Sequence, residues 1–261
     1  IHHLFFYYWS IPQRTQHRSM TDHAIETHSS AGTIPALCRG DGKLLEHWLE
    51  RRPLASVAFC VPAIFLGCGA YGFTMGLWKG WEMASYVGIK FPLVIFATLI
   101  LNGLLNGMLA LALGSGIGFR QSVQFLLTGF ALMAIILAAL SPITFGMALQ
   151  APSPDAVDRE TARHYHSVIL LVHTAVIAFA GVVSHRTLLR HVREFAASAV
   201  LGTRTFFAWL AGNLFVGAQV SWIMRPFFGS PGLDVQFLRD DPLNGSFYDT
   251  VLQSFLTILG G

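Results

Sequence analysis

Charge is what this 261-residue sequence has least of, since only 12% of its residues are Asp, Glu, Lys or Arg. A soluble domain ordinarily carries about twice that fraction. The few charges also crowd into short stretches and leave long windows almost entirely apolar. Such windows, separated by short charged segments, are typical of membrane spans and their loops. We therefore expect an integral membrane protein in contact with a lipid bilayer.

Cysteines and catalytic motifs are also scarce. Only three cysteines occur, two of them (Cys60 and Cys68) in the first apolar window, and none forms a CxxC pair. This pattern excludes a disulfide framework and a zinc site built on cysteine pairs. The sequence has no HExxH, GxSxG or P-loop lysine motif, and its Gly-rich stretch 114–118 links two apolar windows instead of following a strand. We predict no catalytic residues and no metal site.

Five apolar windows are long enough to cross a bilayer, which takes about 20 helical residues. We predict an all-α, polytopic transmembrane helix bundle at 53–225, with spans near 54–78, 91–113, 121–149, 164–184 and 205–224. Residues 79–90 are expected to form an interfacial linker, and the basic stretch from His185 to Arg193 a connection between spans. Ser141–Pro142 should kink or end the third span, because proline disrupts helical hydrogen bonding.

Shorter segments flank the predicted membrane domain. Residues 1–40 are expected to be flexible, and 1–19 not native, because the first methionine is Met20. Residues 41–52 predict an amphipathic helix with Asp41 as N-cap, lying on the membrane surface or docking a partner. Its apolar face comprises Leu44, Leu45, Trp48 and Leu49. Residues 226–261 are predicted to form an extracytoplasmic tail. It should contain a short apolar helix at 247–259, which is too short to span a bilayer and is therefore interfacial, re-entrant or packed on the bundle.

Small residues and amides mark two helix faces as packing surfaces. The first span carries Cys68, Gly72 and Gly76 at intervals of four, and the second carries Asn102, Gly103, Asn106 and Gly107. Small residues let helix backbones approach closely in lipid, and amides there need hydrogen-bond partners, so both faces should point inward. Interhelical hydrogen bonding is our favoured interpretation of the amides. A polar lining for a substrate path, shared with Asn213 and Gln219, is the alternative.

Ionisable groups are almost missing from the predicted span interiors. No Asp or Glu lies there, and His173 is the one deep histidine. Such a histidine can ligate haem or a pigment, or relay protons. A hydrogen-bonded structural histidine is the interpretation we favour, so no cofactor is predicted.

Aromatic and basic residues at the span ends are predicted to be interface anchors, because amphipathic side chains gather at headgroup level. They are Trp48, Trp78, Trp81, Trp222, Arg225, Phe227 and Phe228. In the tail, three aspartates could form ion pairs with two arginines. The aspartates are Asp234, Asp240 and Asp241, and the arginines are Arg225 and Arg239.

The distribution of basic residues predicts an orientation. One side of a five-span arrangement collects nine, against six on the other; the nine are Arg39, Lys43, Arg51, Arg52, Arg120, Arg186, Arg190, Arg193 and Arg204. The positive-inside rule then places the N-terminus in the cytoplasm and the tail outside. Because the basic residues lie at span ends, we expect no nucleic-acid binding from the net charge of +3.

The stretch LNGLLNGMLALALGSGIGFRQSVQFLLTGFALMAIILAALSPI, from Leu101 to Ile143, resembles the middle of Yip-family membrane proteins. In that family a Gly-rich span, a short turn with a basic residue and a second span recur within five helices, and the topology is similar to the one deduced above. The RPFFGSPG segment at 225–232 resembles tails of bacterial multi-spanning proteins. Yip proteins work in eukaryotic vesicle traffic by binding partners, without catalysis. The resemblance implies a non-enzymatic scaffold, and we carry over no site.

Together these features predict a non-enzymatic scaffold or accessory subunit of a larger membrane assembly, in the bacterial inner membrane and with protein partners. Two alternatives stay open. One is a small-solute transporter or channel-like subunit that uses its inward-facing Asn and Gln side chains. The other is a haem- or pigment-associated subunit of an electron-transfer complex.

Overall fold

The computed structural model describes residues 30–50, 52–154, 156–230 and 232–249. The chain divides into two units between Arg39 and Gly40. In the first unit a helix, α1, spans Ser30–Arg39. These ten residues of the segment predicted to be flexible form a helix, with Pro35 inside it. The stretch 1–19, predicted not to be native, lies outside the described residues.

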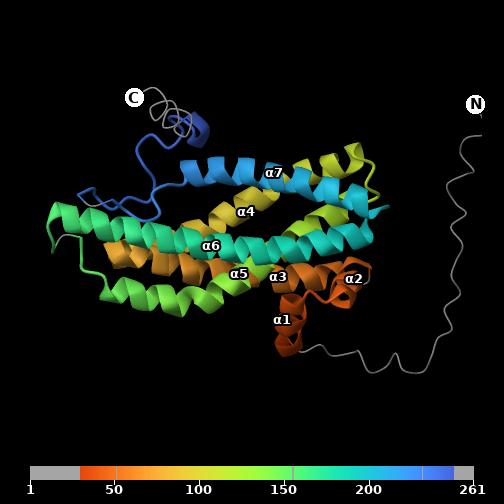
Figure 1. Cartoon of the computed structure of the whole chain (residues 1–261), viewed down its shortest axis with the longest axis horizontal. Helices are drawn as coiled ribbons and strands as arrows, with labels where there is room; N and C mark the ends of the chain where they lie inside the picture. The colour runs from red at the N-terminus through yellow and green to blue at the C-terminus, as the bar shows by residue number, and fades with distance from the viewer. Residues whose placement is uncertain (1–29, 51, 155, 231, 250–261) are drawn as a thin grey trace, which may run out of the picture. The chain divides into compact units, whose positions relative to one another are not determined.

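The second unit is built from helices (Figure 1). In chain order they are α2 (Gly42–Glu50), α3 (Pro53–Gly76), the 3₁₀ turn η2 (Leu77–Lys79), α4 (Trp81–Ala112), α5 (Phe119–Gln150), α6 (Arg159–Phe195) and α7 (Ala199–Ile223). The part of the chain that the structure describes has no strand. The predicted all-α class is confirmed.

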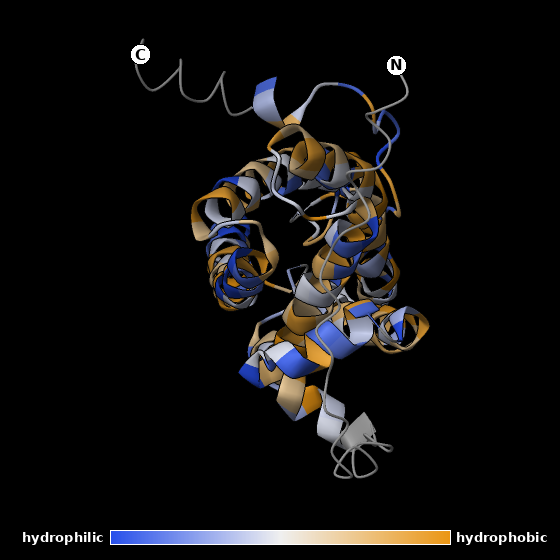
Figure 2. Ribbon diagram, turned by 90° about the vertical axis from the view of Figure 1, so that its right-hand side faces the viewer, coloured by the Kyte–Doolittle hydropathy of each residue, from blue (hydrophilic) through white to orange (hydrophobic). Residues whose placement is uncertain are grey.

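Five of these helices, α3 to α7, are long and apolar enough to cross a membrane. Helix α3 packs against α4 and α5, α4 against α5 and α7, and α6 against α5 and α7. Apolar residues are spread along these helices (Figure 2), and some of them are exposed. Leu66, Met108 and Leu171 are examples, each about two-thirds exposed. Outward apolar faces on long helices are what a bilayer requires, so the chain is an integral membrane protein with five candidate spans.

Two helices extend further than the sequence predicts. Helix α4 begins directly after Gly80, whose φ of 123° separates it from η2, so residues 81–90 are helical rather than a linker. Helix α6 continues through the basic stretch to Phe195. Its 37 residues make it about 55 Å long, against a hydrocarbon core of about 30 Å. Charged residues therefore mark where a helix leaves the hydrocarbon, not where it ends.

Helix α5 passes through Pro142 without ending and reaches Gln150. Proline has no N–H, so the carbonyl of Ala138 loses its helical donor. The Ser141 hydroxyl donates to that carbonyl at 2.7 Å and replaces the missing bond. A neighbouring serine thus allows proline inside a membrane helix.

Helix α2 packs on its own bundle. Asp41 accepts a hydrogen bond from the Lys43 N–H at 3.0 Å, as a helix-capping residue does. Leu45 and Leu49 belong to a core cluster with residues of α5, α6 and α7, and the Trp48 ring lies 5.7 Å from that of Phe59 on α3. The predicted placement of this face on lipid or on a partner is wrong, because the bundle itself buries it.

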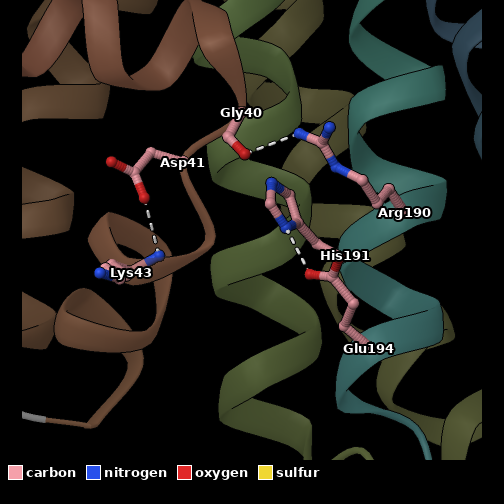
Figure 3. A network of polar contacts seen from close by, with 6 residues as sticks. All are labelled: Gly40, Asp41, Lys43, Arg190, His191 and Glu194. Carbon is pink, nitrogen blue, oxygen red and sulfur yellow. Dashed lines mark hydrogen bonds and ion pairs between the residues drawn. The ribbon is translucent and has the colours of Figure 1, made fainter.

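Polar contacts join the start of the α2 segment to the end of α6 (Figure 3). Arg190 donates from Nη2 to the Gly40 carbonyl at 2.6 Å. Nearby, His191 Nδ1 lies 3.3 Å from the carboxylate of Glu194. Arg120, at the start of α5, donates to the Leu49 carbonyl at 2.5 Å. These contacts fix the bundle end opposite the tail.

Candidate functional site

A buried polar stripe on α4 is the most distinctive feature inside the bundle. Thr98, Asn102 and Asn106 follow one another at intervals of four, which puts them on one helix face. Asn102 and Asn106 are fully buried and Thr98 is almost so. We call these three residues the α4 polar stripe.

Helix α7 covers the stripe. A Cβ atom on Gly212 would lie 3.7 Å from Asn102 Oδ1, and one on Gly217 would lie 3.7 Å from Thr98 Cγ2. The indole Nε1 of Trp209 donates to the backbone carbonyl of Asn106 at 2.8 Å. Both Cβ distances are ordinary van der Waals contacts, so this part of α7 lies directly against the stripe. The surface between the stripe and α7 is the α4–α7 seam.

Most side-chain polar atoms of the stripe have no hydrogen-bond partner in the part of the chain that the structure describes. The Asn106 amide nitrogen reaches Asn213 Oδ1 only at 3.5 Å, at the limit of a hydrogen bond. Among the described residues, the Thr98 hydroxyl, the Asn106 oxygen and both ends of the Asn102 amide find none. An unpaired buried amide or hydroxyl costs about 1–3 kcal/mol. The favoured interpretation of direct interhelical hydrogen bonding thus fits Asn106 and does not fit Asn102.

The two halves of α7 pack differently. Its first half contributes all four fully buried residues of the helix, among them Phe206 and Trp209. From Leu210 to Ile223 no residue is buried, and Leu214 and Phe215 are more than 60% exposed. The half of α7 that covers Thr98 and Asn102 is therefore the less firmly held half.

A small cavity continues the polar character beside the seam. It has a volume of about 10 Å³ and lies between α5, α6 and α7, lined by Ser184, His185 and Asn213 together with apolar side chains. That volume matches one water molecule, which needs two to four polar partners. Gln219, the other α7 amide, accepts from the Phe247 N–H of the tail at 3.4 Å and does not join the seam.

His173 lies in a separate cluster toward the tail end of the bundle. Its Nδ1 is 2.8 Å from the Tyr71 hydroxyl, and its ring is 5.6 Å from that of Phe228. The histidine is fully buried, and its Nε2 has no partner in the described chain. The hydrogen bond to Tyr71 fits the structural interpretation.

The helix arrangement places no second histidine ligand opposite His173 for a haem or pigment. The sequence between Pro53 and Ile223 has histidines only within α6, so no histidine from a facing span can complete a pair. No three His, Cys, Asp or Glu side chains gather closely enough for a metal among the described residues. The residues present therefore do not fit bis-histidine ligation.

The predicted small-residue faces lie at different interfaces. A Cβ on Gly72 or Gly76 would meet the α4 backbone at 2.6 and 2.5 Å, and Cys68 is fully buried. Gly107 lies against the Phe119 ring, whereas Gly103 has only an ordinary contact with Val123. Sequence reasoning missed Gly67, where a Cβ would meet the Ala134 carbonyl at 2.5 Å.

Several predicted interface anchors have other roles. Trp48 and Trp78 are about 95% buried, and Trp78 donates to the Pro152 carbonyl at 3.1 Å, so their assignment as anchors is wrong. The half-buried Phe228 ring lies 5.6 Å from the ring of His173. Two-thirds of the Trp81 side chain is exposed, as an anchor requires. Trp222 and Phe227 are half-buried.

Arg225 packs against its own chain. Its guanidinium lies 3.6 Å from the Trp222 ring and donates to the Trp222 carbonyl at 2.7 Å. No ion pair joins it to an aspartate of the described tail. The predicted pairing of the tail aspartates with Arg225 and Arg239 is therefore not formed.

Sequence reasoning found two residues of the stripe and missed the third. Thr98 stands four residues before Asn102, the same spacing that singled out Asn106, so extending the pattern would have found it. Trp209 and the two α7 glycines carry no such signal, because their roles depend on which helix faces α4. No protein-family model, curated protein or solved structure matches this sequence.

Proposed function

We propose that the protein is a channel-like or transporter subunit for small, uncharged solutes that form hydrogen bonds, with its path along the α4–α7 seam. One observation supports this most strongly. Asn102 is fully buried within a candidate membrane span, yet neither its amide nitrogen nor its oxygen has a partner among the described residues. A solute or water that donates and accepts hydrogen bonds would satisfy both atoms.

The packing of α7 supports a way for the seam to open. Its first half is anchored by Phe206 and Trp209, whereas the half beyond Leu210 has no buried residue. Outward bending of the second half, between the core cluster at its start and the Lys90–Pro226 hydrogen bond just beyond its end, would expose Thr98 and Asn102 and leave both attachments in place.

The charges of the spans favour an uncharged solute. Within the five candidate spans, no Asp or Glu lies in the interior of a helix. The carboxylates there are Glu82, Glu160 and Glu194, and each stands at a helix end. A charged solute at this depth would need an opposite charge. Amides and a hydroxyl suit water, urea or a polyol.

Proteoliposomes test this proposal, with glycerol and urea as probes and light scattering after an osmotic step as the readout. Thr98→Val and Asn102→Leu remove hydrogen-bonding atoms at little change in volume, and Thr174→Val on an exposed face of α6 is the matched control. We expect faster glycerol or urea entry than in empty liposomes, slowed by the two seam variants and unchanged by the control. Equal rates of glycerol and urea entry into protein-free liposomes and into liposomes that contain the protein would refute the proposal.

A scaffold or accessory subunit of a membrane assembly is our second proposal. It rests on α7, which exposes Phe207, Leu214 and Phe215 along its outward side. A protein partner would suit this face as well as lipid does, and partner binding is also what the Yip resemblance implies. Purification in a mild detergent tests it by native mass spectrometry. A lone 28.6 kDa species would count against a stable assembly.

We infer an orientation with the α2 end in the cytoplasm and the tail outside, in the bacterial inner membrane. The excess of basic residues on the α2 side supports it, as do Arg120 and Arg190, which fix that end of the bundle. Reporter fusions after residues 116 and 249 test it. Activity of a periplasmic reporter at residue 116 would reverse the orientation.

A further inference from the structure

The chain beyond α7 folds back over the start of α4 and is held there by Lys90. This lysine is fully buried, and its ammonium donates to the carbonyls of Pro226 and Gln236 at 3.0 and 3.4 Å. The ammonium also lies 4.9 Å from the Phe237 ring centroid. Two carbonyls and an aromatic face compensate a buried cation. The tail therefore has a defined seat on the bundle.

Between the seated tail and α4 lies a cavity of about 470 Å³. Met83 of α4 lines it on the bundle side, and tail residues supply the remaining lining. Its charged lining residues are Arg225, Arg239, Asp234, Asp240 and Asp241. The volume falls within the range of small-ligand sites.

The two arginines of this cavity place neighbouring positive charges where an anion can bind. Burial, and then the neighbouring Arg239 guanidinium, lower the pKa of Arg225, so the two cations lie close enough to repel. Stacking on Trp222 orients Arg225, and its Nε is shut off from solvent without a partner in the described chain. Paired guanidinium groups suit the oxygens of a phosphate.

The three aspartates add the opposite charge within the same cavity. They form no ion pair with either arginine among the described residues. A ligand that is wholly anionic would be repelled by them, whereas an ammonium group would be attracted. Carboxylates accept the N–H bonds of a primary ammonium, while quaternary ammonium groups are typically bound by aromatic cages.

We propose that this cavity binds the headgroup of a zwitterionic phospholipid with a primary ammonium. The phosphate lies between Arg225 and Arg239, and the ammonium faces Asp234, Asp240 and Asp241. The source is a membrane lipid because Arg225 follows the end of α7 at Ile223 by two residues, where headgroups meet the hydrocarbon. This site is separate from the α4–α7 seam and does not depend on the proposed transport.

Thermal unfolding of the full-length protein in nanodiscs tests the proposal. Nanodiscs of phosphatidylcholine alone are compared with ones in which phosphatidylethanolamine or phosphatidylglycerol replaces a third of it, and soluble glycerophosphoethanolamine is added as a further probe. We expect only phosphatidylethanolamine to raise the unfolding temperature. Equal stabilisation by phosphatidylglycerol, no lipid effect, or full stabilisation by the soluble headgroup would each overturn the proposal.

Charge-neutralising variants tie the effect to the cavity. Binding of phosphatidylethanolamine, counted by native mass spectrometry, should weaken about tenfold in Arg239→Gln and in Asp240→Asn, since each loses a charge-assisted contact. Arg159→Gln, an exposed arginine at the start of α6, is the control. Both cavity residues are exposed, so the variants should fold. Wild-type binding in both cavity variants would overturn the proposal.

Discussion

Ser141 shows how one side chain lets a membrane helix contain proline. Its hydroxyl replaces the donor that Pro142 cannot supply to the Ala138 carbonyl. We expect Ser141→Ala to lower the free energy of unfolding by about 1 kcal/mol, since a carbonyl is left unpaired. Chemical unfolding in detergent measures it. Ser167→Ala is the control, because that exposed hydroxyl also donates to a helical carbonyl, but no proline removes the backbone donor there. Equal losses in both variants would contradict this role.

At Gly76 a methyl group would clash with the backbone of α4. A Cβ there would lie 2.5 Å from the Met83 carbonyl oxygen and 2.8 Å from the Ala84 Cα. Because both neighbours are backbone atoms, Gly76→Ala should destabilise the protein by about 1–3 kcal/mol through forced separation of α3 and α4. Gly181→Ala on α6 meets nothing within 4 Å and should leave stability unchanged or slightly raised. Thermal unfolding of the two variants side by side checks the contrast.

At the scale of elements, the start of α6 depends on Asp158. Its carboxylate accepts from the Thr161 hydroxyl at 2.6 Å and from the N–H groups of Glu160 and Thr161 at 3.0 Å. These hydrogen bonds, first that of the Thr161 hydroxyl, lower the pKa of the carboxyl. A lowered pKa means that the cap stabilises the fold fully above the unfolded value of about 4, and that this stabilisation is lost as pH falls through the folded value.

Asp158→Asn separates this effect from other acid-induced changes, since an amide oxygen caps without titrating. Between about pH 6 and pH 3, wild-type protein should lose more unfolding temperature than Asp158→Asn does. Differential scanning calorimetry in detergent across that range measures it. Parallel losses in the two proteins would mean that Asp158 does not contribute through its charge.

The sequence predicts the number and order of the membrane helices, because hydrophobic windows are a local property. It does not predict where α4 and α6 end. Lys90 and the basic residues near Arg190 suggested loops, but a helix continues past a charge that finds a partner or reaches water. Likewise, the stripe residues Asn102 and Asn106 could be recognised from spacing, whereas the fit of α7 glycines over them is a tertiary property that no local pattern carries.

For the whole molecule, the structure combines a firmly packed side with a loosely covered one. Helices α3 and α4 approach closely through glycines, while the second half of α7 covers the unpaired amide of Asn102 without a single buried residue. Firm packing supplies stability, and weakly held elements are where functional motion concentrates. We infer that the seam opens when solute passes.

A reversible disulfide across the seam tests whether it must open. A Cβ on Gly217 would lie 3.7 Å from Thr98 Cγ2 and 3.9 Å from Thr98 Oγ1, so a small approach of the two helices would let cysteines at both positions form a disulfide. The variant Thr98→Cys/Gly217→Cys is made with Cys38→Ser, because Cys38 is the exposed free cysteine among the three. Glycerol entry into its proteoliposomes is measured before and after reduction, with Gly217→Cys alone as control. We expect slow glycerol entry in the oxidised double variant and at least a severalfold rise on reduction, with no such rise in Gly217→Cys alone. The same rate in both redox states of the double variant would show that the seam does not open.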